Sequence, residues 1–199
     1  MANPYFDKIA WLYPIIGFLR IKNKFYKNIK KFTNPDSIVL DVGGGTGIIA
    51  ELLVNDIKEI TILDPSKNML KKIKSKKIKK LLGSAENIKF KDKTFDLVYC
   101  VDSFHHFTNS YEKSEHKRII QKCLRELIRI LKPKGKLLII EFDNKSKIGK
   151  IIEYFENRIM KWHSNFYNPE GLESLFKNYK TKIHKINTYC YMLEVNLNH

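Results

Sequence analysis

The chain has 199 residues, long enough to bury one sizeable hydrophobic core, and 43% of them are hydrophobic, which is too many for a disordered protein. The formal net charge of +16 arises from 37 Lys and Arg against 21 Asp and Glu. No apolar run reaches the roughly 18 to 20 residues that span a bilayer. We therefore expect a cytoplasmic protein without a signal peptide, membrane anchor or transmembrane segment.

Lysine dominates the basic residues, because only 5 of the 37 are Arg. Since base readout and phosphate clamping favour Arg, the charge points only weakly to nucleic acid. A lysine-rich composition typical of an AT-rich genome or a hot habitat is the preferred explanation. The three cysteines, at positions 100, 123 and 190, match neither a disulfide framework nor a metal site. The sequence thus predicts a reducing compartment and no bound metal.

Apolar residues at helical spacing predict a helical segment over residues 4–31, interrupted by Pro14 and Gly17. Strands and helices then alternate along the chain. We expect strands at 37–42, 59–64, 78–85, 95–102 and 136–142, with helices at 46–55, 66–77 and 112–131. This alternation predicts an α/β fold with a parallel sheet and right-handed crossovers.

The last part of the chain predicts a helix near 147–160, an aromatic loop from Trp162 to Gly171, and a short helix. Two further strands follow, with a tight turn near Asn187, so the sheet should have seven strands in all. Neither an internal repeat nor a linker divides the chain. We expect a single domain over residues 1–199.

The stretch "DVGGGTG", residues 41–47, follows the first predicted strand. Glycines at this point let a ligand lie against the backbone beside a helix N-terminus, although a tight turn would also explain them. Asp64 ends the next predicted strand, where a carboxylate can accept two hydrogen bonds from a ribose diol or can cap a helix. The glycine stretch and Asp64 stand at the ends of adjacent predicted strands, and together they favour a nucleoside-containing ligand.

Several motifs in this order resemble the class I S-adenosylmethionine-dependent methyltransferases of the methyltransferase type 11 group, which includes UbiE-like enzymes. The likeness covers most of residues 5–143 and is carried by "YFDKIAWLYP", "VLDVGGGTG", "LDPSKNML", "GSAENIKFKDKTFDLVYC" and "LRELIRILKPKGKLLIIEF". It implies a Rossmann-like fold with a mostly parallel seven-stranded sheet, helices on both faces and a C-terminal antiparallel strand. It also implies S-adenosylmethionine as the cofactor. Residues 1–31 would then form a helical lid, residues 37–143 the cofactor-binding core, and residues 144–199 the part that completes the sheet and substrate pocket.

The resemblance implies a role for each matching position. Gly43, Gly44 and Gly45 would face the methionine part of the cofactor, with Asp41 nearby, and Asp102 and Ser103 would line the same side. Asp64 would hold the ribose hydroxyls, Met69 would pack by the adenine, Ala85 and Glu86 would offer it backbone groups, and Tyr13 would close over the cofactor. Ser84 stands where many relatives have Asp, so its contact to the adenine would be an uncharged one.

Methyl transfer from a sulfonium needs alignment and desolvation more than an elaborate catalytic set. A base is required only if the acceptor must lose a proton, and His106 in "DSFHHF" is the candidate, with a packing role as the alternative. Glu141 and Asp143 could steer a cationic substrate, but a solvated strand end is the preferred interpretation. His105 and His106 replace the Arg-Asn pair that ring-methylating quinone enzymes usually carry, which leaves the acceptor open.

Seven of the ten residues 71–80 are Lys. We expect this cluster at the end of the sheet opposite the ligand, which argues against RNA methylation but not against docking to an acidic partner or a membrane surface. The sequence therefore favours a methyltransferase acting on a small, partly apolar molecule. A non-catalytic cofactor-binding subunit and an RNA or protein methyltransferase are the alternatives. The oligomeric state is left open.

Overall fold

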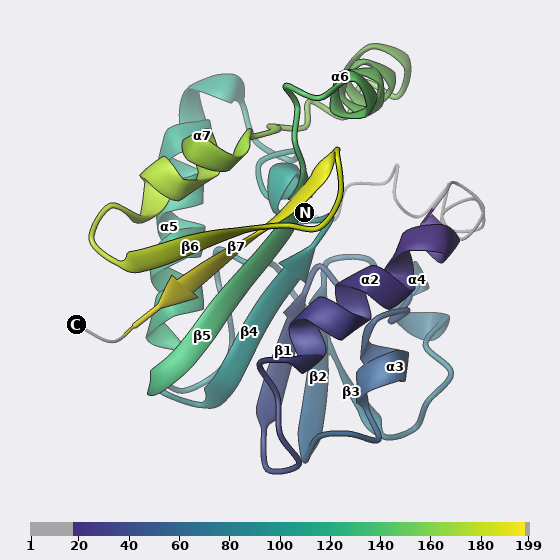
Figure 1. Ribbon diagram of the computed structural model, residues 1–199, viewed down its shortest axis with the longest axis vertical. Coiled ribbons are helices and arrows are strands. Elements are labelled where there is room, and N and C mark those ends of the chain that lie inside the picture. The colour runs from purple at the N-terminus through teal and green to yellow at the C-terminus, as the bar shows by residue number, and fades with distance from the viewer. Residues whose placement is uncertain (1–17, 198–199) are drawn as a thin grey trace.

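The computed structural model describes residues 18–197 (Figure 1). A seven-stranded sheet in the order β3-β2-β1-β4-β5-β7-β6 forms its centre. The strands are β1 (Ile38–Val42), β2 (Glu59–Asp64), β3 (Ile78–Leu82), β4 (Phe95–Val101), β5 (Leu131–Phe142), β6 (Lys180–Lys185) and β7 (Cys190–Asn196). The first five run parallel, and β7 lies antiparallel to both β5 and β6. This arrangement confirms the predicted fold class.

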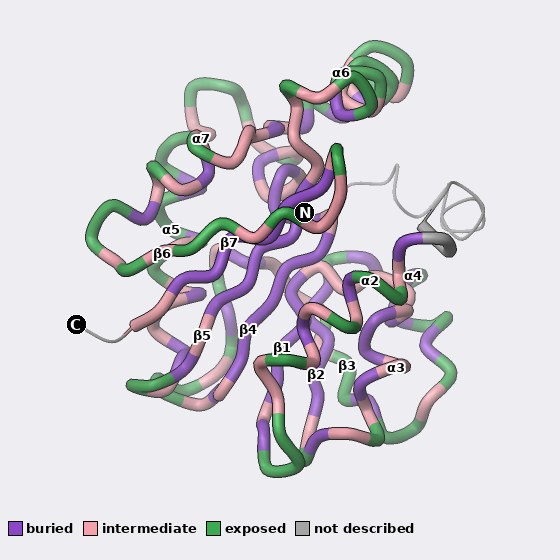
Figure 2. The backbone as a smooth tube through the Cα atoms, viewed as in Figure 1, coloured by how far each residue is buried: buried purple, intermediate pink, exposed green. Residues whose placement is uncertain are grey.

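Helices cover both faces of the sheet, because successive strand residues point to opposite sides. On one face, α2 (Phe18–Lys30), α3 (Ala50–Leu53) and α4 (Lys67–Lys71) pack on a cluster that includes Phe25, Leu97 and Tyr99. On the other, α5 (His116–Arg129) and α7 (Pro169–Glu173) pack on a cluster that includes Cys123 and Val98 (Figure 1). The central strands are buried along most of their length (Figure 2).

Several elements differ in length from the prediction. The helix after β1 is a single turn, α3, and it starts later than predicted because Gly47 holds a φ of 78°, which is not helical. The helix after β2 ends at Lys71, since the lysines that follow repel one another at helical spacing. Strand β5 is longer than expected and starts at Leu131, where the register to β4 shifts between Phe95 and Leu97.

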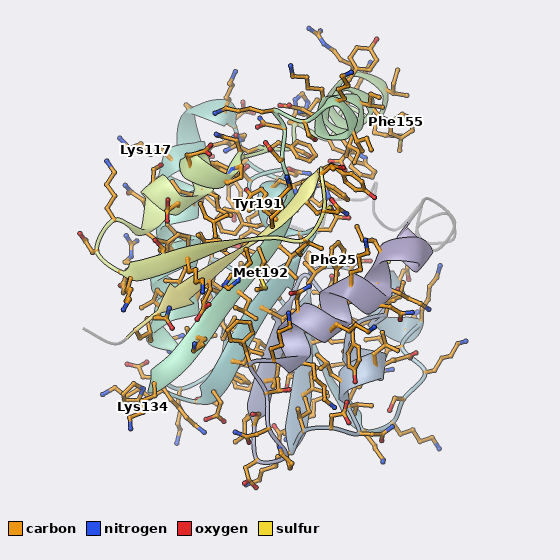
Figure 3. All side chains as sticks on the ribbon, viewed as in Figure 1. Phe25, Lys117, Lys134, Phe155, Tyr191 and Met192 are labelled. Atoms are coloured by element: carbon orange, nitrogen blue, oxygen red, sulfur yellow. The ribbon has the colours of Figure 1, made fainter. Side chains whose placement is uncertain are left out.

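The segment after β5 lies beyond the carboxyl end of the sheet. Helix α6 (Lys147–Tyr154) is followed by a π-helical turn, η3 (Phe155–Ile159). Together they occupy the helix predicted near 147–160. Figure 3 shows Phe155 of η3 at the opposite end of the molecule from Lys134, near the start of β5. Among residues 18–197, no helix is long and apolar enough to cross a bilayer.

Candidate functional site

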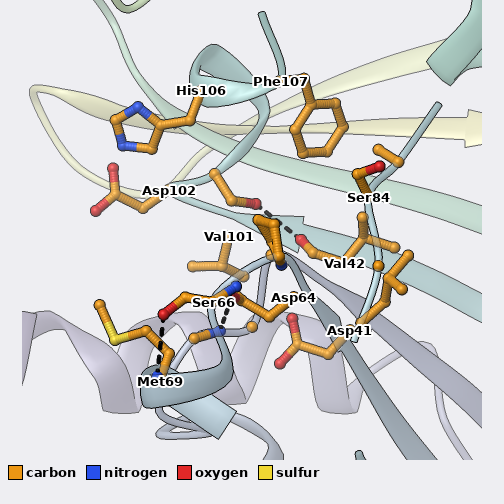
Figure 4. Close-up of a pocket in the computed structure, with 18 of the residues that line it drawn as sticks. Asp41, Val42, Asp64, Ser66, Met69, Ser84, Val101, Asp102, His106 and Phe107 are labelled. Carbon is orange, nitrogen blue, oxygen red and sulfur yellow. Dashed lines mark hydrogen bonds between the residues drawn. The ribbon is translucent and has the colours of Figure 1, made fainter. Parts of the chain in front are cut away.

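A cavity of about 390 Å³ opens at the carboxyl ends of the parallel strands. That volume lies within the roughly 300 to 1,000 Å³ of small-molecule sites, and open α/β sheets bind ligands at this edge. Twelve of the thirteen residues predicted for the site line it: Asp41, Gly43, Gly44, Gly45, Asp64, Met69, Ser84, Ala85, Glu86, Asp102, Ser103 and His106 (Figure 4). Tyr13, the thirteenth, lies outside the described residues. Residues far apart in the sequence therefore meet around one space.

The three glycines after β1 have different tasks. Gly43 and Gly45 adopt φ values of 73° and 55°, which side chains disfavour. A Cβ atom at Gly43 would stand 2.6 Å from the Ser103 Cβ, and one at Gly44 would stand 2.5 Å from the Asp41 carboxylate. At Gly45 a Cβ would meet nothing within 4 Å. Gly43 and Gly44 thus allow the side chains of Ser103 and Asp41 to approach the backbone of the turn, and Gly45 leaves open space in the cavity.

Asp41 is buried below the glycine turn and accepts a hydrogen bond of 2.9 Å from the Tyr99 hydroxyl. Burial, reinforced by the charge of Asp64, raises the pKa of Asp41 to about 8. A cationic ligand in the cavity would favour its ionised form. The sequence analysis did not single out Tyr99, although a buried tyrosine on a central strand needs a partner for its hydroxyl.

Asp64 is buried and ties two turns together. One carboxylate oxygen accepts from the Gly45 amide at 2.9 Å, and the other accepts from the Ser66 amide at 2.8 Å. Ser66, not Asp64, caps α4, because its hydroxyl accepts from the Met69 amide. Asp64 also lines the cavity, so its carboxylate stands at the edge of the space that a ligand would occupy.

The loop after β3 carries a second acidic group. Glu86 accepts hydrogen bonds from the hydroxyls of Ser84, at 2.6 Å, and of Tyr111, at 2.8 Å. Although burial alone would raise it, these hydrogen bonds hold the pKa of Glu86 below its usual value. The Ser84 hydroxyl donates to Glu86, so only its oxygen lone pairs are left for an adenine amino group. Tyr111, from another loop, was not anticipated.

Asp102 follows β4 with a φ of 52°, a left-handed conformation that few residues other than glycine adopt. Its carboxylate lies beside the His106 ring in the cavity wall (Figure 4). His106 Nδ1 is 3.0 Å from both Ser164 Oγ and Asn109 Nδ2. Burial, with the neighbouring charge of His105, lowers the pKa of His106 to about 3. A neutral His106 with this pKa is a weak base.

The neighbouring His105 does not line the cavity but forms a buried ion pair. Its Nδ1 lies 2.5 Å from Glu141 Oε2, and Glu141 Oε1 accepts from the Phe104 amide at 2.8 Å. The interpretation of Glu141 as a solvated strand end is therefore wrong, because the fold covers this strand end with the segment after η3. Asp143 does remain at the surface, where it accepts from the Lys145 amide.

The aromatic loop packs on the two histidines. Phe166 stacks on the His105 ring at 4.3 Å between centroids, and Trp162 meets the His106 ring edge-on at 5.5 Å. Neither Trp162 nor Phe166 lines the cavity, nor do His163 and Tyr167 from the same loop. The loop therefore supports the cavity wall from behind.

Comparisons with known proteins agree with this geometry. A family model for a methyltransferase domain matches residues 40–139. The chain is 32% identical over 168 residues to a demethylmenaquinone methyltransferase of Thermotoga maritima, a match over 77% of this chain and 68% of that protein. It is 38% identical over 125 residues to the uncharacterized protein MJ0638 of Methanocaldococcus jannaschii, a match over 62% of this chain but only 49% of that protein. The chain thus spans between about half and two thirds of the length of these relatives.

A solved structure has the same fold. The S-adenosylmethionine-dependent methyltransferase of Aquifex aeolicus superposes with a TM-score of 0.74 over 96% of this chain and 98% of that one, at 17% identity. The matched domain model and the relative at 32% identity extend the likeness from fold to family. The chain therefore belongs to the class I S-adenosylmethionine-dependent methyltransferases, in the methyltransferase type 11 group.

Proposed function

We propose that this chain transfers a methyl group from S-adenosylmethionine to a small, partly apolar molecule by in-line displacement. The observation that carries the proposal is the cavity itself, in which the glycine turn, Asp64 and the loop after β3 surround one open space. The cofactor supplies the methyl group on a positively charged sulfur. The protein would bind and align it and keep water away, which is most of what this displacement needs.

The residues present fit this cofactor. Gly45 faces open space, so the methionine part can lie against the backbone, with Gly43, Gly44, Ser103 and Asp41 around it. Asp64 lines the cavity where the ribose hydroxyls would lie, and Met69, Ser84, Ala85 and Glu86 border the space left for the adenine. The carboxylates of Asp41, Asp64 and Asp102 would offset the positive charge of the cofactor.

The acceptor would enter beside Asp102 and His106. Its class is a proposal drawn from the small cavity and from relatives such as the demethylmenaquinone methyltransferase. We keep His106 as the candidate base, although its lowered pKa favours a hydrogen-bonding role toward the acceptor. A panel of short-chain demethylmenaquinone analogues, phenols and amines, assayed for methyl transfer, would identify the class. Binding of S-adenosylmethionine without transfer to any acceptor would favour the non-catalytic alternative.

Asp64→Asn should weaken binding of S-adenosylmethionine and of its demethylated product by about 1–3 kcal/mol, because a ribose hydroxyl loses its charged acceptor. Calorimetric titration measures the affinity. The exposed Asp36, away from the cavity, provides the control substitution Asp36→Asn, which should change nothing. If Asp64→Asn binds the cofactor as tightly as the parent chain, the carboxylate serves only the two turns that it joins.

The alternative of an anionic macromolecular substrate depends on Lys74, Lys76, Lys77 and Lys79, just before and at the start of β3. They lie near the start of β3, which runs parallel to β2, so they stand at the end of the sheet opposite the cavity. Several pair locally: Lys79 with Glu59 at 2.6 Å, and Lys77 with Asn55 at 2.9 Å. These exposed charges stand a strand's length away from the cavity. They are screened there, because the Debye length is about 8 Å at physiological salt.

Replacing Lys74, Lys76, Lys77 and Lys79 together by Gln should leave cofactor affinity and turnover of a small acceptor unchanged within about twofold, since screened surface charges contribute little. Turnover at low and at physiological salt measures this. A large fall in turnover with normal cofactor binding would contradict the small-molecule proposal and make RNA the leading substrate class.

A further inference from the structure

Exposed apolar side chains gather on one short segment of the chain. Within residues 18–197, seven large hydrophobic side chains are exposed, and five of them belong to α6 and η3: Ile148, Ile151, Tyr154, Phe155 and Ile159. The other two, Leu82 and Ile183, lie on the two opposite edge strands of the sheet. Single exposed hydrophobic residues are ordinary, whereas a contiguous group of them marks an interaction site.

The spacing of the five residues places them along one side of the helix. Positions 148, 151, 155 and 159 are three or four residues apart, so their side chains follow one another in a row, and Tyr154 lies beside it. Ile151 is 67% exposed and Tyr154 is 61% exposed. Figures 1 and 2 show α6 standing out beyond the sheet, with most of its length exposed. We call these five residues the α6 face.

The opposite side of the same segment is fixed to the rest of the fold. Gly149 is buried so closely that a Cβ atom there would stand 1.9 Å from the Asp143 carbonyl oxygen. Glu156 is buried in its ion pair with the imidazole beside the cavity. Asn157 exchanges two hydrogen bonds with the backbone of Ser164, at 2.9 and 2.6 Å. These contacts set the rotation of the segment and keep the α6 face at the surface.

The charges around the α6 face are mostly positive. Lys147, Lys150, Arg158 and Lys161 are exposed on or directly after the segment, whereas Glu153 is half-buried. A surface that combines apolar and basic side chains is complementary to an anionic lipid layer. The apolar groups can enter the layer, and the long basic side chains can reach the headgroups.

We propose that the α6 face docks this protein on an anionic lipid surface, with α6 lying in the plane of the interface. A second copy of the chain fits the face less well, because a symmetric contact would bring the same four cations against one another. A lipid layer also accepts a projecting helix without the matching groove that a folded acidic partner would have to supply. The contact is peripheral, since none of the described helices can cross a bilayer.

Docking through the α6 face differs from docking through the lysine cluster at residues 71–80. The start of β3, where that cluster lies, is at the end of the sheet opposite the cavity. Helix α6 and η3 lie beyond the carboxyl ends of the strands, at the same end as the cavity (Figure 3). The α6 face would therefore hold the cavity end of the protein toward the lipid, in which a partly apolar acceptor is dissolved. This consequence rests on the proposed function, and the lipid binding does not.

The test is co-sedimentation of the full chain with vesicles of equal parts phosphatidylglycerol and phosphatidylcholine, and with vesicles of phosphatidylcholine alone. We expect binding to the mixed vesicles that weakens as salt is added, and binding at least about tenfold weaker to phosphatidylcholine alone. Replacing Ile151, Phe155 and Ile159 together by Ser should lower the affinity for the mixed vesicles at least about tenfold. The melting temperature should change little, because all three side chains are exposed.

Two controls separate the α6 face from exposed apolar groups and from charge in general. Ile183→Ser removes an exposed apolar side chain from β6, far from α6 along the sheet edge. The variant with Gln at positions 74, 76, 77 and 79 removes four cations from the other end of the sheet. Each should bind the mixed vesicles within about threefold of the parent chain. Full affinity in the triple Ser variant, or loss of binding only in the lysine variant, would overturn the proposal.

Tyr154→Trp adds a reading that does not depend on lost binding. The extra emission, taken as the difference from the parent chain, should shift to the blue on the mixed vesicles and be quenched by lipids brominated on their acyl chains. Extra emission that is already blue without vesicles would mean that the chain itself covers the α6 face. A dimer in light scattering that the triple Ser variant dissociates would mean that a second copy covers it. Either result, or no binding to the mixed vesicles, overturns the proposal. These assays contain neither S-adenosylmethionine nor acceptor, so their outcome is separate from that of the proposed methyl transfer.

Discussion

Gly45→Val should abolish binding of S-adenosylmethionine, whereas Gly47→Ala, in the same turn, should preserve it. Both positions have positive φ values, 55° and 78°, so either substitution strains the backbone by about 1–2 kcal/mol. They differ in where a side chain would point. A Cβ at Gly45 projects into open space in the cavity, and one at Gly47 meets Ile62 and Ile73 at 3.1 Å in the core.

Calorimetric titration of both variants, together with their melting temperatures, separates strain from obstruction. Gly45→Ala adds one carbon and should lie between the parent chain and Gly45→Val in affinity. Comparable losses of stability with loss of binding only at Gly45 would locate the cofactor beside this glycine. Normal affinity in Gly45→Val would place the ligand elsewhere and remove the basis for the proposed site.

Glu141→Ala should destabilise the fold by about 3–5 kcal/mol, the usual cost of leaving one partner of a buried ion pair alone. Glu141 is 2% exposed, and its carboxylate holds His105 Nδ1 and the Phe104 amide. Although burial alone would lower it, the charges of Glu141 and Glu156 raise the pKa of His105 well above its usual value. Without Glu141 the imidazole must either lose its proton or remain charged with poorer compensation.

Guanidinium unfolding of the two variants and the parent chain measures this difference. The control is Glu170→Ala, which removes an exposed carboxylate 3.4 Å from Lys145 and should cost at most about 1 kcal/mol. A loss at Glu141 no greater than that at Glu170 would mean that the pair with His105 contributes little to the stability of the fold.

Most of the fold could be predicted from the sequence because its signals are local. Apolar strands separated by amphipathic helices identify a parallel α/β sheet, and all seven predicted strands are present. The helices after β1 and β2 were predicted too long, because apolar spacing does not show how far the glycine turn delays the start of the first or where repelling lysines end the second. The start of β5 was missed because an irregular pairing with β4, not residue type, defines it.

The site was predictable in part for the same reason. Parallel strands end at one edge of the sheet, so the residues that follow β1, β2, β3 and β4 had to meet there, and the described ones do. The sequence by itself thus determined the fold class, the place of the cavity and the residues that border it. Local spacing carries this information, because each of those residues lies at the end of a strand or in the turn or helix that follows it.

Only the tertiary structure decided what these side chains do. Glu141 is the buried partner of His105, 36 residues away, because the segment after η3 covers the end of β5. The Tyr99 hydroxyl donates a hydrogen bond to Asp41, which is 58 residues away on a neighbouring strand. Glu156 pairs with His105 from η3, a turn whose place does not follow from the end of any strand. The charge state of a carboxylate or an imidazole depends on its burial and on the groups around it, and both exist only after distant segments have packed together.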